Sequence, residues 1–154
     1  MPVKLRTIVL VIAAAAATLW AADDPLVGTW KFNHAKTNTN GAIPKTRTMT
    51  IAPSGNGFTV RTDTVAQQGK QESYTYMISP DGKEYPDRGG PDRDTISWKR
   101  IDARHWETTS KKAGKITAQS KRDLSPDGKT FTINNTTWNA QGQPVHSVVV
   151  YDKQ

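Results

Sequence analysis

The sequence contains no cysteine, which excludes disulfide bonds and any chemistry that depends on a thiolate. It also lacks the Gly-x-Ser-x-Gly elbow of hydrolases, the phosphate-binding glycine loop and the dinucleotide fingerprint. After residue 25 no segment shows the periodicity of an amphipathic helix. A disulfide-stapled domain and a nucleotide-binding α/β fold are therefore both disfavoured.

Histidine is scarce as well, and the three histidines are isolated in the sequence: His34, His105 and His146. None shows the His-x-His or Glu-x-x-His spacing of a metal site. Asp92 and Asp94 flank Arg93 without the closing Glu of a calcium loop, which favours a salt-bridged loop. We predict that the protein is not an enzyme and holds neither a metal nor a cofactor.

Acidic residues number 14 against 21 lysines and arginines, which gives a formal net charge of +7. The basic residues are scattered along the chain. Nucleic-acid binding would favour a basic stripe with interleaved aromatic residues, so we predict no nucleic-acid partner. A dispersed positive charge still allows weak attraction to polyanions.

The chain has one long apolar run, which lies near its start. Lys4 and Arg6 precede an apolar stretch over 8–17, and Ala21 or Ala22 offers a cleavage point. This layout predicts a secretory signal peptide over 1–22. The alternative is a retained anchor, but a membrane span needs about 20 apolar residues. We expect residues 23–154 to form one secreted or periplasmic domain with no stable membrane insertion after cleavage.

Short β-type segments separated by Gly-bearing turns make up the rest of the chain. The turns lie at 54–57, 67–70, 80–83, 112–115, 126–129 and 140–143. The segments rich in β-branched and aromatic residues are 26–33, 45–52, 57–65, 70–78, 94–101, 104–111, 115–123, 129–138 and 144–152, with a possible short strand at 83–86. The pattern predicts an all-β, up-and-down antiparallel meander that closes into a barrel of 8–10 strands. The irregular stretches 34–44 and 79–93 are candidate loops at its opening.

The segment Gly28-Thr29-Trp30 resembles the opening signature of the lipocalins and fatty-acid-binding proteins. The resemblance implies a barrel in which Trp30 plugs the closed end and Gly28 lets the backbone bend there. Lipocalins usually carry an arginine after the last strand to stack on that tryptophan, whereas here only Lys153 follows. Segments 81–86, 94–102 and 142–153 also resemble those of small exported bacterial lipocalin-like proteins. This resemblance implies a fold for the chain but no particular chemistry.

Alternation along the predicted strands gives each a candidate inner face. Several of these faces are apolar at one end and polar at the other, as in Phe58 with Thr62. In the segment 115–123 the candidate inner face joins Ile116 and Ala118 to Arg122. Because neighbouring strands run in opposite directions, we expect the polar ends to be divided between the two rims.

Polar groups inside a barrel need partners, because an unpartnered buried group costs several kcal/mol. The candidate ligand-binding residues on the inner faces are Arg100, Arg122, Tyr74, Tyr76, Tyr151, Trp98 and Trp106. Arginine can hold a carboxylate or phosphate through two parallel hydrogen bonds, and tyrosine adds a directional hydroxyl. The alternative is that both arginines lie near strand ends and reach solvent.

Two functions remain open. The first is an exported protein that binds a small amphipathic or apolar molecule inside the barrel. The second is an envelope interaction protein whose barrel is packed solid and whose basic surface contacts polyanions. An unfilled interior favours the first.

Overall fold

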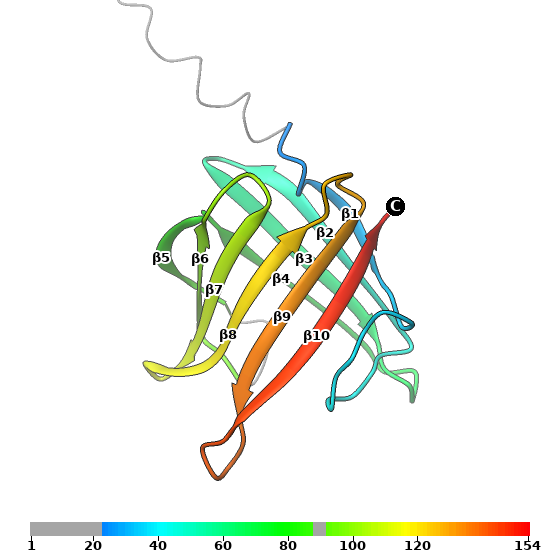
Figure 1. Ribbon diagram of the computed structural model, residues 1–154, viewed down its shortest axis with the longest axis vertical. Helices are drawn as coiled ribbons and strands as arrows, with labels where there is room; N and C mark the ends of the chain where they lie inside the picture. The colour runs from blue at the N-terminus through cyan, green and yellow to red at the C-terminus, as the bar shows by residue number, and fades with distance from the viewer. Residues whose placement is uncertain (1–22, 88–91) are drawn as a thin grey trace, which may run out of the picture.

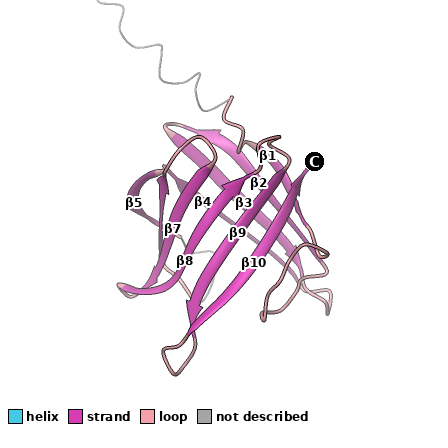
Figure 2. Cartoon of the chain, in the orientation of Figure 1, coloured by secondary structure: helices cyan, strands magenta, loops and turns pink. Residues whose placement is uncertain are grey.

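The computed structural model describes residues 23–87 and 92–154. The predicted signal peptide, 1–22, lies outside these described residues. The described part consists of strands and loops (Figure 2). No helix among the described residues has both the length and the apolar character needed to cross a membrane.

Ten strands follow one another along the chain. They are β1 (Gly28–Phe32), β2 (Thr46–Ser54), β3 (Gly57–Val65), β4 (Gln71–Ile78), β5 (Asp81–Pro86), β6 (Thr95–Arg100), β7 (His105–Lys112), β8 (Lys115–Leu124), β9 (Thr130–Trp138) and β10 (Pro144–Lys153). All nine segments predicted as strands are present, and the short segment at 83–86 belongs to β5. The predicted antiparallel meander is therefore confirmed.

The strands form one curved sheet in the order β4-β3-β2-β1-β10-β9-β8-β7-β6-β5 (Figure 1). Every neighbouring pair is antiparallel, and β1 pairs with β10. β4 and β5 are the two edges of the sheet and share no ladder in the part of the chain that the structure describes. The predicted closure is thus corrected: the barrel is nearly closed, with a gap between β4 and β5.

The end of the barrel where β1 begins is closed by aromatic side chains, and we call it the closed end. Trp30 is fully buried, its Nε1 donates to the Leu26 carbonyl at 2.9 Å, and its ring lies 5.5 Å from that of Phe131. Lys153 Nζ lies 5.1 Å from the centre of the Trp30 ring and donates to the Pro25 carbonyl at 2.8 Å. A lysine therefore takes the place that the resemblance gives to an arginine.

Gly28 allows this lysine to approach. Its φ is +143°, and a Cβ built there would lie 2.8 Å from Lys153 Cε. A residue with a side chain would meet both an unfavourable backbone conformation and a collision. Gly28 thus permits the lysine to lie across the closed end.

The polar ends of the inner faces gather at one end, which corrects the expectation that they divide between two rims. β3, β7 and β9 run in the same direction, because an even number of antiparallel pairings separates any two of them in the sheet. Each begins at the closed end with buried aromatic residues: Phe58, Trp106 and Phe131. Beyond Val60 and Ile133 the inward residues of these strands are polar, so the opposite end, the open end, has a polar interior.

Ile116 is a second correction, because it is 47% exposed. Ser110 pairs with Ala118 while Lys111 pairs with Ile116, so Thr117 is an extra residue in β8. This β-bulge breaks the alternation that the sequence pattern assumed. Ala118 and Arg122 face the interior as expected, whereas Ile116 does not.

The hairpin between β7 and β8 has a strained residue. Lys112 pairs with Lys115, and the two residues between them have positive φ, 47° at Ala113 and 76° at Gly114. A left-handed conformation costs a residue with a Cβ roughly 1–2 kcal/mol. Gly114 adopts it without that cost.

We therefore expect Ala113→Gly to raise the free energy of unfolding by about 1 kcal/mol, measured by urea denaturation. The matched control is Ala140→Gly in the β9–β10 turn, where alanine has an ordinary φ. That change should be neutral or slightly destabilising, because glycine only adds freedom to the unfolded chain. Equal effects at both positions would contradict the strain at Ala113.

Candidate functional site

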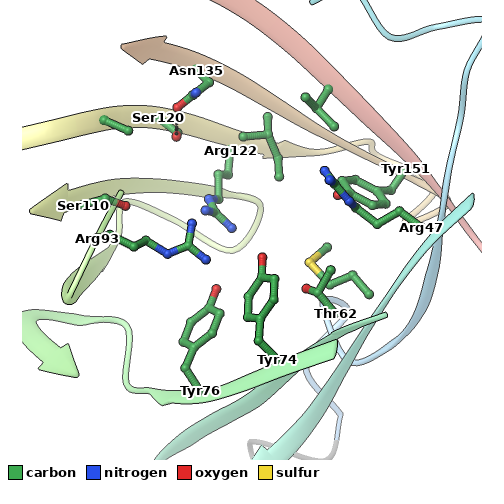
Figure 3. Close-up of a pocket in the computed structure, with 14 residues that line it drawn as sticks. Arg47, Thr62, Tyr74, Tyr76, Arg93, Ser110, Ser120, Arg122, Asn135 and Tyr151 are labelled. Carbon is green, nitrogen blue, oxygen red and sulfur yellow. Dashed lines mark hydrogen bonds between the residues drawn. The ribbon is translucent and has the colours of Figure 1, made fainter. Parts of the chain in front are cut away.

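A cavity of about 200 Å³ lies inside the barrel (Figure 3). Its lining is mostly polar and comes from strands on all sides: Arg47, Met49, Thr62, Tyr74, Tyr76, Arg93, Ser110, Ala118, Ser120, Arg122, Ile133, Asn135, Val149 and Tyr151. A second pocket of about 220 Å³ shares four of these residues and adds Asp92, Thr117 and Thr137. We call the first space the interior cavity; the second continues it toward the open end.

Arg122 of β8 is one of the two arginines that sequence reasoning placed inside, and it lines the interior cavity. Its guanidinium carbon lies 4.3 Å from the centre of the Trp98 ring. Its Nε is buried and has no hydrogen-bond partner among the described residues. Burial lowers the pKa of this guanidinium, and the positive charge of Arg93 acts in the same direction. The site therefore holds a desolvated cation with an unused donor, its Nε.

Arg93 enters the interior cavity from the segment between β5 and β6. Its Nε lies 2.5 Å from Asp87 Oδ2, and Asp87 is fully buried. Its guanidinium lies 5.4 Å from the centre of the Tyr74 ring, which belongs to β4. Burial lowers the pKa of Arg93, but Tyr74 and Asp87 raise it by more, so the net shift is upward. Arg93 thus links the two unpaired edges of the sheet through side chains.

Arg47 of β2 is the third guanidinium in the interior cavity. Its Nε donates to Thr64 Oγ1 at 3.1 Å, and its guanidinium carbon lies 5.9 Å from the centre of the Phe32 ring. Figure 3 shows it beside Tyr151, across the interior cavity from Arg93 and Arg122. Within the described ranges, neither Arg47 nor Arg122 forms an ion pair.

Three tyrosine hydroxyls face the same space. The rings of Tyr74 and Tyr76 are stacked, with centres 6.4 Å apart, and Figure 3 shows their hydroxyls directed at Arg93 and Arg122. Burial raises the pKa of Tyr76 to about 12 and also raises that of Tyr151. At neutral pH both phenols therefore stay protonated and can donate a hydrogen bond to an anion.

The structure separates the predicted site residues into two groups. Arg122 lies in the interior cavity together with all three predicted tyrosines. Trp98 and Trp106 are buried in the core and do not line it. Arg100 lies outside it: its guanidinium forms an ion pair with Asp24 and lies 5.0 Å from the centre of the Trp106 ring.

Sequence reasoning missed Arg47 and Arg93. Arg47 alternates with Met49 and Ile51 along β2, a signal that periodicity could have revealed. Arg93 lies in an irregular segment where no periodicity applies, so only the tertiary structure brings it inside.

Histidine and carboxylate side chains do not assemble into a metal site. Within residues 23–87 and 92–154, no three His, Cys, Asp or Glu side chains come together in a way that could hold an ion. His105 instead lies 2.7 Å from Asp102 and 3.7 Å from Asp123. His34 Nε2 lies 2.9 Å from the Pro44 carbonyl oxygen.

The ten antiparallel strands with a gap between β4 and β5 form a β-barrel with the same overall fold as a fatty-acid-binding protein and a bile-acid-binding protein of known structure. The ten strands fall within the predicted range of 8–10, and the gap distinguishes this form from the predicted closed barrel. No protein-family model matches the sequence, and no curated protein matches it.

Two solved structures carry this assignment. A Schistosoma mansoni fatty-acid-binding protein in complex with arachidonic acid superposes with a TM-score of 0.60 at 15% identity, over 86% of this chain and 98% of that one. The zebrafish ileal bile-acid-binding protein complexed with cholic acid gives a TM-score of 0.54 at 14% identity, over 84% of this chain and 99% of that one. At this identity the likeness shows the fold alone.

Tyr76 makes stability depend on pH in the alkaline range. Its phenol has a pKa of about 12 in the folded state but ionises near 10 when the chain is unfolded. Between these values the unfolded state loses the proton first, so we expect the free energy of unfolding to fall as pH rises from 10 to 12, by up to about 2 kcal/mol. Urea denaturation at several pH values measures this.

The matched variants are Tyr76→Phe, which should remove part of the alkaline loss, and Tyr85→Phe, which should retain it. Tyr85 lies outside the interior cavity, on β5. The same alkaline slope in the Tyr76 variant as in the unmodified protein would contradict a raised phenol pKa.

Proposed function

We propose that the protein binds a small amphipathic anion in its interior cavity, with the acidic group of the ligand held by Arg122. The observation that carries this proposal is the Arg122 Nε, which is buried in the barrel without a partner among the described residues. A buried donor left unsatisfied costs about 1–3 kcal/mol, and more when it is charged. An anion that accepts from Arg122 and the neighbouring tyrosines would remove that cost.

Two further observations support an interior ligand. The interior cavity and the pocket that continues it, at about 200 and 220 Å³, together reach the lower part of the ~300–1,000 Å³ range of ligand pockets. The two solved structures with this fold hold arachidonic acid and cholic acid, which are both acids. The small and mostly polar space in this chain favours a small ligand.

Binding rather than catalysis is the activity we propose. The interior cavity offers guanidinium, phenol, hydroxyl and amide groups but no histidine, carboxylate pair or thiol among its lining residues. The same cavity favours interior binding over the alternative that a solid barrel contacts polyanions with its surface.

The experiment is a titration of the purified protein with 8-anilinonaphthalene-1-sulfonate, an amphipathic anion whose fluorescence rises in an apolar site. We expect Arg122→Met to weaken binding roughly tenfold or more, because a hydrogen bond to a charged group contributes about 1.5–3 kcal/mol. Arg100→Met is the matched control, since Arg100 also lies over a tryptophan but outside the interior cavity. Its affinity should be unchanged.

Absence of dye binding to the unmodified protein would overturn the proposal, as would equal losses in the two variants. Thermal unfolding of both variants shows whether they are folded. If Arg122→Met fails to fold, competition of the dye by octanoate in the unmodified protein still tests interior binding of a carboxylate.

We also propose that this binding takes place outside the cytoplasm, in an exported member of the small bacterial lipocalin-like proteins. This part rests on residues 1–22 and on segments 81–86, 94–102 and 142–153 alone. N-terminal sequencing of the protein from a secreting bacterial host should begin at Ala22 or Asp23. A chain that retains Lys4 and Arg6 would contradict export with cleavage.

A further inference from the structure

The interior cavity contains more positive charge than its own carboxylate can balance. Three guanidinium groups line it: Arg47, Arg93 and Arg122. Buried Asp87 neutralises Arg93 at 2.5 Å, whereas Arg47 and Arg122 form no ion pair among the described residues. Neither of these two guanidinium groups therefore has a carboxylate at ion-pair distance.

We infer that the interior cavity selects ligands that carry two negative charges over ligands that carry one. This inference rests on the proposed function and names its ligand class. A single carboxylate would leave one of the two guanidinium groups without an ion-pair partner, and an unpaired charge costs more the further it is removed from water. Two negative charges balance both.

The positions of the two unbalanced arginines fit this ligand class. Arg122 comes from β8 and Arg47 from β2, which β1, β10 and β9 separate in the sheet, so the two arginines enter the interior cavity from different walls of the barrel (Figure 3). Each interacts electrostatically with a tyrosine: Arg122 with Tyr76, and Arg47 with Tyr151. Both walls therefore offer a cation together with a neutral donor, which is the combination that binds carboxylate and phosphate oxygens.

The apolar part of the ligand must be short. The apolar lining consists of only four side chains, which lie among the polar ones: Met49, Ala118, Ile133 and Val149. A ligand with two charges and a short hydrocarbon could be a phosphate monoester, whose one group reaches both arginines. It could equally be a dicarboxylate with one carboxylate on each wall. The two share the feature that matters here, a double negative charge.

Isothermal titration calorimetry at pH 8 with three ligands of equal chain length tests the inference: octanoate, octyl phosphate and octanedioate. We expect at least one of the two dianions to bind roughly tenfold or more tightly than octanoate, because an added hydrogen bond between charged groups contributes that much. Tighter binding of octyl phosphate indicates a single head group, and tighter binding of octanedioate indicates two separate carboxylates.

A second measurement uses the proton on the ligand and needs no variant. A phosphate monoester gains its second charge near pH 6. The affinity for octyl phosphate should therefore rise between pH 5.5 and pH 8, while the arginines remain charged throughout. Octanoate, which carries one charge across most of this range, should show no such rise.

Arg47→Met should reduce the preference for the dianion to about the level of octanoate, because it removes one unbalanced charge. The matched control is Arg61→Met. Arg61 is exposed on β3 and pairs with Asp63 outside the interior cavity, so the preference should persist there. If Arg47→Met does not fold, the pH profile of the unmodified protein still decides.

Each outcome separates the two proposals. Equal affinity for octanoate and both dianions, with no rise for octyl phosphate, overturns the charge selectivity and leaves interior anion binding standing. No heat and no dye displacement with any of the three ligands overturns both. Loss of the preference in Arg61→Met as strongly as in Arg47→Met would assign it to the net charge of the protein and overturn the role of the interior cavity.

Discussion

Burial of aromatic rings at the closed end is the interaction on which the rest of this barrel depends. Trp30, Trp106 and Phe131 contact one another in a chain of rings 5.5 and 6.2 Å apart. Large aromatic side chains bury 150–250 Å² each and dominate the energetics of small cores. Because this cluster gathers the apolar residues of β1, β7 and β9 at one end, the other end does not need them. The polar interior is possible for this reason.

Cation–π contacts are the second recurring device. Three cations lie over tryptophan rings: Lys153 on Trp30, Arg100 on Trp106 and Arg122 on Trp98. Such a contact contributes about 0.5–1 kcal/mol at the surface and about 2 kcal/mol or more when desolvated. It stabilises a charge but does not satisfy its hydrogen-bond donors. Of these three cations, only Arg122 also lies on the wall of the interior cavity, and the proposed function centres on it.

The gap between β4 and β5 shows how side chains can replace a ladder. Arg93 joins the buried Asp87 at the end of β5 to the ring of Tyr74 on β4. A buried charge pair is retained at a substantial desolvation cost. Here the pair also places the guanidinium of Arg93 in the interior cavity, where Asp87 neutralises its charge. The gap and the interior cavity are therefore parts of one arrangement rather than separate features.

The sequence by itself determined the strands, because turn residues and period-2 alternation are local properties. The Gly-bearing turns and β-type segments gave ten strands in the right places, and the alternation brought Tyr76 and Arg122 to the inner face. It could not determine the exclusion of Ile116 or Arg100. A one-residue bulge reverses the face of Ile116, and Asp24, which is distant in the chain, captures Arg100 at the closed end.

Only the tertiary structure decided which polar groups meet. Arg93 comes from an irregular segment, and Arg47 comes from a strand far from Arg122 in the sequence, yet all three line one cavity. Asp87 lies beside Arg93 and forms an ion pair with it. Among the described residues, no carboxylate forms an ion pair with Arg47 or Arg122. Such a balance depends on distances between strands, and distances between strands are not a local property of the chain.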